Sequence, residues 1–72
     1  MTENELKIEA SDEMTLLKYA DMAELMNIDV SKARDIVRAG GVPLVDMGTR
    51  THRVRLADVK RFINAGGFRS NV

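Results

Sequence analysis

Between residues 29 and 43, apolar side chains recur every three or four positions, which is the spacing of one face of an α-helix. Asp29 precedes the first of them, where its carboxylate can accept hydrogen bonds from the amides of a first helical turn. Gly40 or Gly41 can adopt the left-handed conformation that ends a helix, and Pro43 prevents a restart. The pattern therefore predicts a short amphipathic helix. Its apolar face consists of Val30, Ala33, Ile36 and Val37.

A second helical pattern comes just before this one, from Lys18 to Met26. Asn27 can close that helix, Ile28 can pack into the core, and Asp29 then opens the next helix. Two short helices joined by so short a connection match the helix-turn-helix arrangement. The apolar stripe of this first helix consists of Tyr19, Met22, Ala23 and Met26, with Leu25 beside it.

After Pro43 the apolar period changes to two, which is the period of a β-strand. Residues 44–47 are a short apolar run, residues 48–52 indicate a loop, and residues 53–56 alternate polar and apolar. These segments predict a two-stranded β-hairpin with a basic tip, which needs helices to lean on. From Ala57 the helical period returns. The apolar side of this last helix consists of Leu56, Val59, Phe62 and Ile63, and the helix ends at Gly66 and Gly67.

These elements divide the 72 residues into a flexible acidic arm (1–15), one small α+β domain (16–65) and a loose tail (66–72). The chain has no cysteine, which excludes a disulfide framework and a thiolate metal site. No apolar run reaches the length of a membrane span, so we expect no membrane partner and a cytoplasmic protein.

Charge is distributed unevenly although the net charge is zero. Residues 1–29 carry two basic and eight acidic side chains, net −6, whereas residues 30–61 carry eight basic and three acidic side chains, net +5. A polarised surface of this kind attracts polyanionic partners, and double-stranded DNA is the partner we expect. The alternative is that the charges only solvate a small domain.

Catalysis has little support in the sequence. The single histidine, His52, lies in a loop between Thr51 and Arg53, and a general acid or base needs a partner and a dry pocket. No His and carboxylate residues have metal-ligand spacing, and Gly40-Gly41 follows a helix where a phosphate-binding loop would precede one. We therefore expect no catalytic residue, no metal and no cofactor.

DNA contacts are better supported, because both the helix over residues 30–38 and the hairpin carry basic residues. The N-terminal residues of a recognition helix face base edges in the major groove, where Lys32 or Arg34 can donate to guanine O6 and N7. The hairpin would contact phosphates or the adjacent minor groove. The predicted helix contacts are Ser31, Lys32, Arg34, Asp35 and Arg38. The predicted hairpin contacts are Thr49, Arg50, Thr51, His52, Arg53 and Arg55.

Four further residues have two interpretations or an unexpected charge. Lys60 and Arg61 are either plain surface or phosphate contacts. Tyr19 either packs in the core or donates its hydroxyl to a phosphate, with the core favoured. Asp35 would repel phosphate unless it accepts a base-edge amino proton or pairs with Lys32 or Arg38.

The order helix, tight turn, basic helix, hairpin and helix resembles the excisionase-type members of the MerR-like winged helix-turn-helix superfamily. The resemblance covers roughly residues 16–63. Lys18, Asn27 and Asp35 depart from the family, which commonly has Thr or Ser, Gly, and Arg at those positions. The resemblance is carried by Asp21, Ala23, Leu25, Met26, Ile28-Asp29, Ile36-Val37, Gly40, Val42-Pro43, Gly48-Thr49-Arg50, Arg53-Val54, Asp58-Val59 and Phe62-Ile63.

The resemblance implies a phage or mobile-element excisionase, also called a recombination directionality factor. Such proteins bind adjacent DNA sites head-to-tail, bend the DNA and direct a site-specific integrase, a tyrosine recombinase, toward excision. Two alternatives stay open. One is a small transcriptional regulator built on the same domain, and the other is a protein-interaction module that does not bind DNA.

Overall fold

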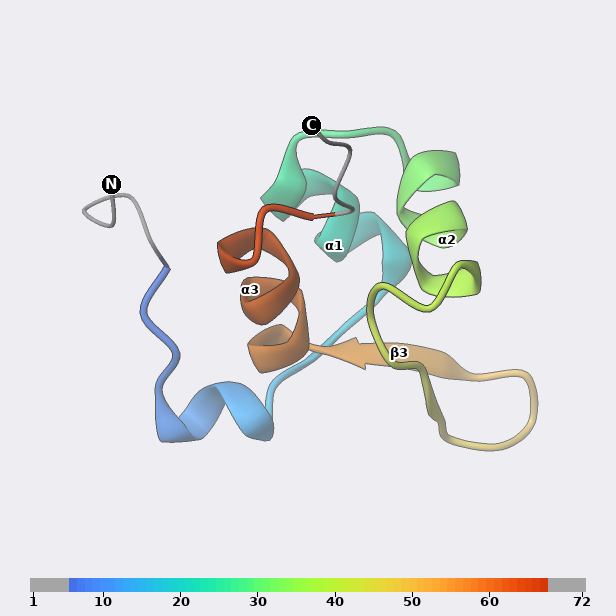
Figure 1. Ribbon diagram of the computed structural model, residues 1–72. Coiled ribbons are helices and arrows are strands. Elements are labelled where there is room, and N and C mark those ends of the chain that lie inside the picture. The colour runs from blue at the N-terminus through green and yellow to red at the C-terminus, as the bar shows by residue number, and fades with distance from the viewer. Residues whose placement is uncertain (1–5, 68–72) are drawn as a thin grey trace.

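Three α-helices pack around a three-stranded antiparallel sheet in the computed structural model, which describes residues 6–67 (Figure 1). The predicted α+β class is confirmed. The sheet contains one strand more than the predicted hairpin. In chain order the elements are a 3₁₀-helix, η1 (Ala10–Glu13), then β1 (Leu16–Leu17), α1 (Tyr19–Met26), α2 (Val30–Arg38), β2 (Val45–Asp46), β3 (His52–Arg55) and α3 (Leu56–Asn64).

The additional strand, β1, pairs with the edge of β3 opposite to β2, so the strand order is β1-β3-β2. Leu16 pairs with Arg55, and on the other side of β3 Val45 pairs with Arg53. A strand of two residues is too short to produce an alternating pattern, which is why the sequence did not predict it. Residues 1–5 of the predicted arm and 68–72 of the predicted tail lie outside the described residues.

The predicted helix ends are confirmed, and α1 and α2 end in the same way. Asn27 closes α1 with a φ of 59°, and Gly40 follows α2 with a φ of 88°. In both cases the next amide donates back to a carbonyl in the last turn: Ile28 to Ala23 and Gly41 to Ile36, each at 2.9 Å. This pairing is the Schellman motif, and asparagine is one of the few residues other than glycine that tolerates it.

The start of α2 differs from the prediction in two ways. Asp29 occupies the cap position with extended backbone, but its carboxylate accepts no capping hydrogen bond. Val30 is 40 % exposed, so it is not part of the buried face. By the helical period Val30 lies on the same side as Val37 but two turns earlier. The neighbouring elements cover only the later turns of that side.

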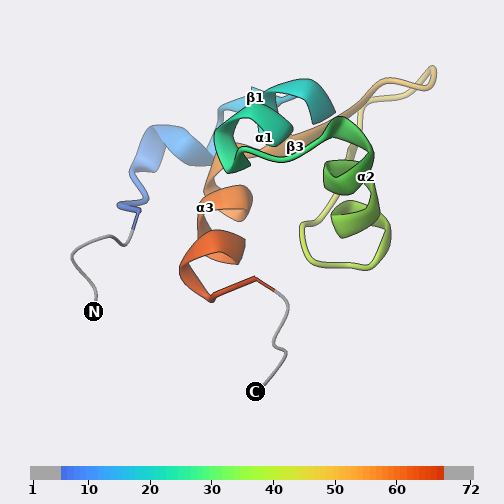
Figure 2. The same cartoon turned by 90° about the horizontal axis from the view of Figure 1, so that it is seen from above.

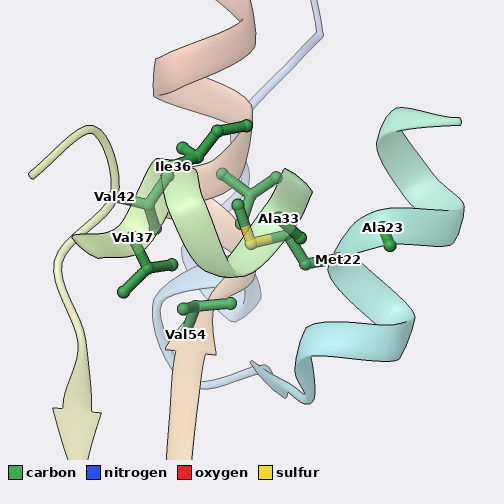
Figure 3. Packing of buried hydrophobic residues seen from close by; sticks show 8 residues of the cluster. Met22, Ala23, Ala33, Ile36, Val37, Val42 and Val54 are labelled. Carbon is green, nitrogen blue, oxygen red and sulfur yellow. The ribbon is translucent and has the colours of Figure 1, made fainter. Parts of the chain in front are cut away.

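One hydrophobic core joins all the main elements (Figure 3). Met22 extends from α1 toward α2, where it lies near Ala33, and Val54 of β3 lies beneath them. All three side chains are fully buried. Because α2 and β3 share this core, the basic helix and the hairpin are held in a fixed relation. The buried cluster consists of Met22, Ala23, Ala33, Ile36, Val37, Val42, Val54 and Val59.

The described part of the predicted N-terminal arm lies along α3. The Leu6 amide donates to the Asn64 side-chain oxygen at 2.7 Å, and the Asn64 amide nitrogen donates back to the Leu6 carbonyl at 2.7 Å. The Lys60 ammonium donates to the Lys7 carbonyl at 3.0 Å. These contacts fix an arrangement that the sequence did not suggest, while the flexibility assigned to residues 1–15 stays a prediction.

Candidate nucleic-acid interface

The predicted DNA contacts gather at one end of the molecule. α2 and the β2–β3 hairpin lie at that end, whereas η1 and α3 lie toward the other (Figures 1 and 2). The molecule measures 41 Å along its longest axis, so the two ends present separate surfaces. The predicted α2 contacts are all exposed: Ser31, Lys32, Arg34, Asp35 and Arg38.

The helical period sorts the exposed residues of α2 into a row and two flanks. Because Ala33, Ile36 and Val37 face the core, Ser31, Asp35 and Arg38 form the row on the opposite side. Arg34 and Lys32 lie on its two flanks. Asp35 is thus central in the outward row, and within residues 6–67 it forms no salt bridge with Lys32 or Arg38.

Arg34 reaches back toward α1, where its guanidinium carbon lies 5.6 Å from the centre of the Tyr19 ring. At this distance a cation is attracted to the face of an aromatic ring. Tyr19 is half-buried and packs against the core, as expected, and its ring also supports Arg34. Sequence could not reveal this contact, because the two residues lie in different helices.

The hairpin tip is a tight turn in which Gly48, Thr49 and Arg50 all have positive φ angles, of 82°, 49° and 63°. The Thr51 amide donates to the Gly48 carbonyl at 2.8 Å, which closes the turn. The Asp46 carboxylate accepts from the Gly48 amide at 2.8 Å. A β-branched residue such as Thr49 rarely adopts this conformation, and such strain costs on the order of 1–3 kcal/mol. The tip thus presents Arg50 in a conformation defined by the turn.

The strand after the tip alternates as predicted. Val54 is fully buried, whereas Arg55 is exposed and Arg53 is half-buried. One Arg53 guanidinium nitrogen donates to the His52 carbonyl at 2.8 Å. His52 Nε2 lies 4.0 Å from Asp46 Oδ1, and these two residues form the strand pair next to the turn.

A hollow of about 360 Å³ lies between α2 and the hairpin, and we name it the α2–hairpin hollow. Among residues 6–67 no acidic residue lines it. Its basic or imidazole side chains come from α2 and β3, and its apolar side chains come from α1, α2 and the segment after Pro43. The lining residues are Tyr19, Arg34, Val37, Arg38, Leu44 and His52. The sequence indicated several of these residues but gave no sign that they converge.

The basic residues of α3 form salt bridges with carboxylates. Lys60 Nζ lies 2.8 Å from Asp12 Oδ2, and both side chains are largely buried. Arg61 is bonded to Glu13 and, at 2.9 Å, to Asp58. The hydrogen bond from Lys60 holds the pKa of Asp12 below its ordinary value of 3.8, and the bond to Glu13 raises the pKa of Arg61. Both cations are therefore neutralised within the fold.

Among residues 6–67, the basic residues of α2 and the hairpin have no carboxylate partners. Within the part of the chain that the structure describes, none of them forms a salt bridge with a carboxylate, although Arg34 and Arg53 make the other contacts described above. Their positive charge is left for the surface. These residues are Lys32, Arg34, Arg38, Arg50, Arg53 and Arg55.

Among residues 6–67 no group of three His, Asp or Glu side chains is arranged to hold a metal ion. No helix in the same range is long and apolar enough to cross a membrane. Comparison of the chain with protein-family models, curated proteins and solved structures found no match. The function is therefore inferred from the residues and their geometry.

Proposed function

We propose that this chain is a winged helix-turn-helix DNA-binding protein. The observation that carries the proposal is that six basic residues without carboxylate partners in the described chain lie on α2 and the hairpin, of which Arg55 is where β3 meets α3. Cations that the fold does not neutralise can displace the counterions of a duplex, and the release of those ions drives binding.

In this proposal α2 enters the major groove. An α-helix with its side chains is about 10–12 Å across, and the groove is about 12 Å wide, so α2 fits with its outward row toward the bases. Ser31 lies at the N-terminal end of that row, and Asp35 lies at its centre. Asp35 accepts a hydrogen bond from an exocyclic amino group of cytosine or adenine, which explains an unpaired carboxylate on a DNA-facing helix. Lys32 donates to guanine from the flank.

The hairpin grips the DNA beside this groove. Its tip carries Arg50 into the adjacent minor groove or onto its phosphates, and Arg53 and Arg55 contact the backbone nearer the domain. Thr49, Thr51 and His52 add hydrogen bonds along the same strand. The shared core keeps α2 and β3 in register, so that helix and hairpin engage the duplex together.

The biological role we propose is that of an excisionase. Its protomers occupy adjacent sites head-to-tail, bend the DNA and direct a site-specific integrase toward excision. This role follows from the sequence resemblance. The charge polarity supports it, because the acidic N-terminal portion of one protomer can approach the basic end of the next.

The first test is a salt titration of wild-type binding to random-sequence duplex. We expect the affinity to fall steeply between about 50 and 200 mM salt, with a slope of about −0.9 for each phosphate contacted. A flat response would overturn DNA binding and would favour a protein-interaction module.

The second test concerns the excisionase role. Duplexes selected from a randomised pool would supply a target site, and binding would then be measured on one copy and on tandem copies. We expect cooperative binding to tandem copies and slowed gel mobility from bending. Independent, unbent binding would contradict the excisionase role and would favour a transcriptional regulator.

A further inference from the structure

The α2–hairpin hollow lies where the proposed major-groove and minor-groove contacts meet. We propose that it is a site for one sugar–phosphate unit of the DNA backbone, with Arg34 and Arg38 sharing a single phosphate. This inference rests on the proposed DNA binding and adds to it a specific ligand group and a shared contact.

The charges around the hollow suit an anion. Arg34 and Arg38 lie one turn apart on α2, so their side chains project to the same side of the helix. His52 supplies a ring nitrogen from β3, the opposite wall of the hollow. Its Nε2 is 4.0 Å from Asp46, but no carboxylate of the described residues lines the hollow itself. An anion between α2 and β3 would therefore meet donors from two elements.

The apolar part of the lining suits a deoxyribose. Leu44 is 42 % exposed, and Val37 and the Tyr19 ring lie in the same lining. A sugar seated there would cover Leu44 while its phosphate lies between the arginines. The volume of about 360 Å³ is near the lower end of the range for small-ligand sites, which fits one backbone unit.

Arg34 is already positioned for this contact. Its guanidinium lies over the Tyr19 ring, which limits the conformations of a long side chain while leaving the donors at its edge available. Tyr19 is thus a positioning residue, acting on the phosphate through Arg34.

The test compares the salt dependence of binding for three proteins on random-sequence duplex: wild type, Arg34→Gln with Arg38→Gln, and Arg50→Gln with Arg53→Gln. The slope counts the phosphates neutralised, at about 0.9 each. If Arg34 and Arg38 share one phosphate, the first pair of substitutions lowers the slope by about 0.9 in total. The second pair removes two separate contacts and lowers it by about 1.8. Circular dichroism confirms that each variant is folded.

A fall of about 1.8 for the first pair would overturn the shared site, as would no change in slope. A flat slope for the wild type would instead overturn DNA binding itself, so the two failures are distinguishable.

A second readout tests Tyr19. Tyr19→Leu, which removes the ring, should weaken binding about two- to fivefold in wild type and not at all in the Arg34→Gln background. Tyr19→Phe keeps the ring and is the matched control, with affinity close to wild type. Equal weakening by Tyr19→Leu in both backgrounds would contradict the positioning role.

Discussion

The two ends of this molecule treat their basic residues in opposite ways. At the α3 end, Lys60 forms a salt bridge with Asp12. Arg61 forms salt bridges with Glu13 and Asp58. At the α2–hairpin end, the basic side chains lack carboxylate partners among residues 6–67. Both sets of cations lie in the same basic half of the sequence. What separates them is the position of the acidic N-terminal portion, which folds back along α3.

Net charge counted along the sequence therefore overstates how many basic side chains are available to bind a polyanion. A basic residue that pairs with a carboxylate in the folded protein contributes to stability, because the ion pair is lost on unfolding. One that the fold leaves unpaired is available to a ligand. By pairing with the basic residues of α3, the acidic half limits the candidate interface to the α2–hairpin end of the molecule. Substitutions at either end, or in the core that joins them, test this difference.

The largest effect is expected in the core that connects the two ends. Met22→Ala removes a fully buried side chain between α1 and α2, and we expect it to cost about 2–5 kcal/mol of unfolding free energy. Denaturant unfolding measures this. Leu25→Ala in the same helix removes a side chain that is 43 % exposed and should cost much less. Equal losses would contradict the position of the core.

The next effect concerns the hairpin tip. Gly48→Ala places a Cβ at a φ of 82°, and we expect a loss of about 1–2 kcal/mol. Apart from Gly48 and its two chain neighbours, no atom of residues 6–67 lies within 4 Å of that Cβ, so the cost is conformational. Thr49→Asn should change stability in the other direction, because asparagine tolerates a positive φ better than threonine. Thermal melts of both variants test this, and a Tm unaffected by either substitution would contradict the turn.

A smaller effect is expected at the paired end as pH falls. The pKa of Asp12 is lower in the folded protein than its ordinary value of 3.8, so the Asp12–Lys60 pair stabilises the fold fully above that value. The contribution is lost as pH falls through the folded-state pKa. We therefore expect wild type to exceed Asp12→Asn in Tm at pH 7, with the gap closing below pH 3.8. A gap that stays constant with pH would contradict the pair.

The sequence predicted most of the regular structure. Helical and alternating periods located α1, α2, α3 and β3, because each has enough residues to show a period, and the short apolar run before the turn located β2. Asn27 and Gly40 marked two helix ends through their tolerance of left-handed backbone. β1 was missed because its two residues show no period and no turn signal precedes them. Asp29 occupies the predicted cap position of α2, but its predicted capping hydrogen bond was wrong, because a suitable side chain does not guarantee the bond.

The candidate site was predicted as a set of residues but without its arrangement. The period of α2 identified which side chains are exposed. It could not identify which distant groups meet them: the contact of Arg34 with Tyr19 and the pairing of Lys60 with Asp12 join segments far apart in the chain. Tertiary contacts of this kind depend on the complete fold.

The most direct test of the account compares two arginines, one from each end, in binding to random-sequence duplex. Arg50→Gln and Arg61→Gln make the same chemical change and alter net charge equally. We expect Arg50→Gln to weaken binding and to lower the salt slope by about 0.9, whereas Arg61→Gln leaves both near wild type. Equal losses for the two variants would contradict the claim that only the unpaired end meets DNA.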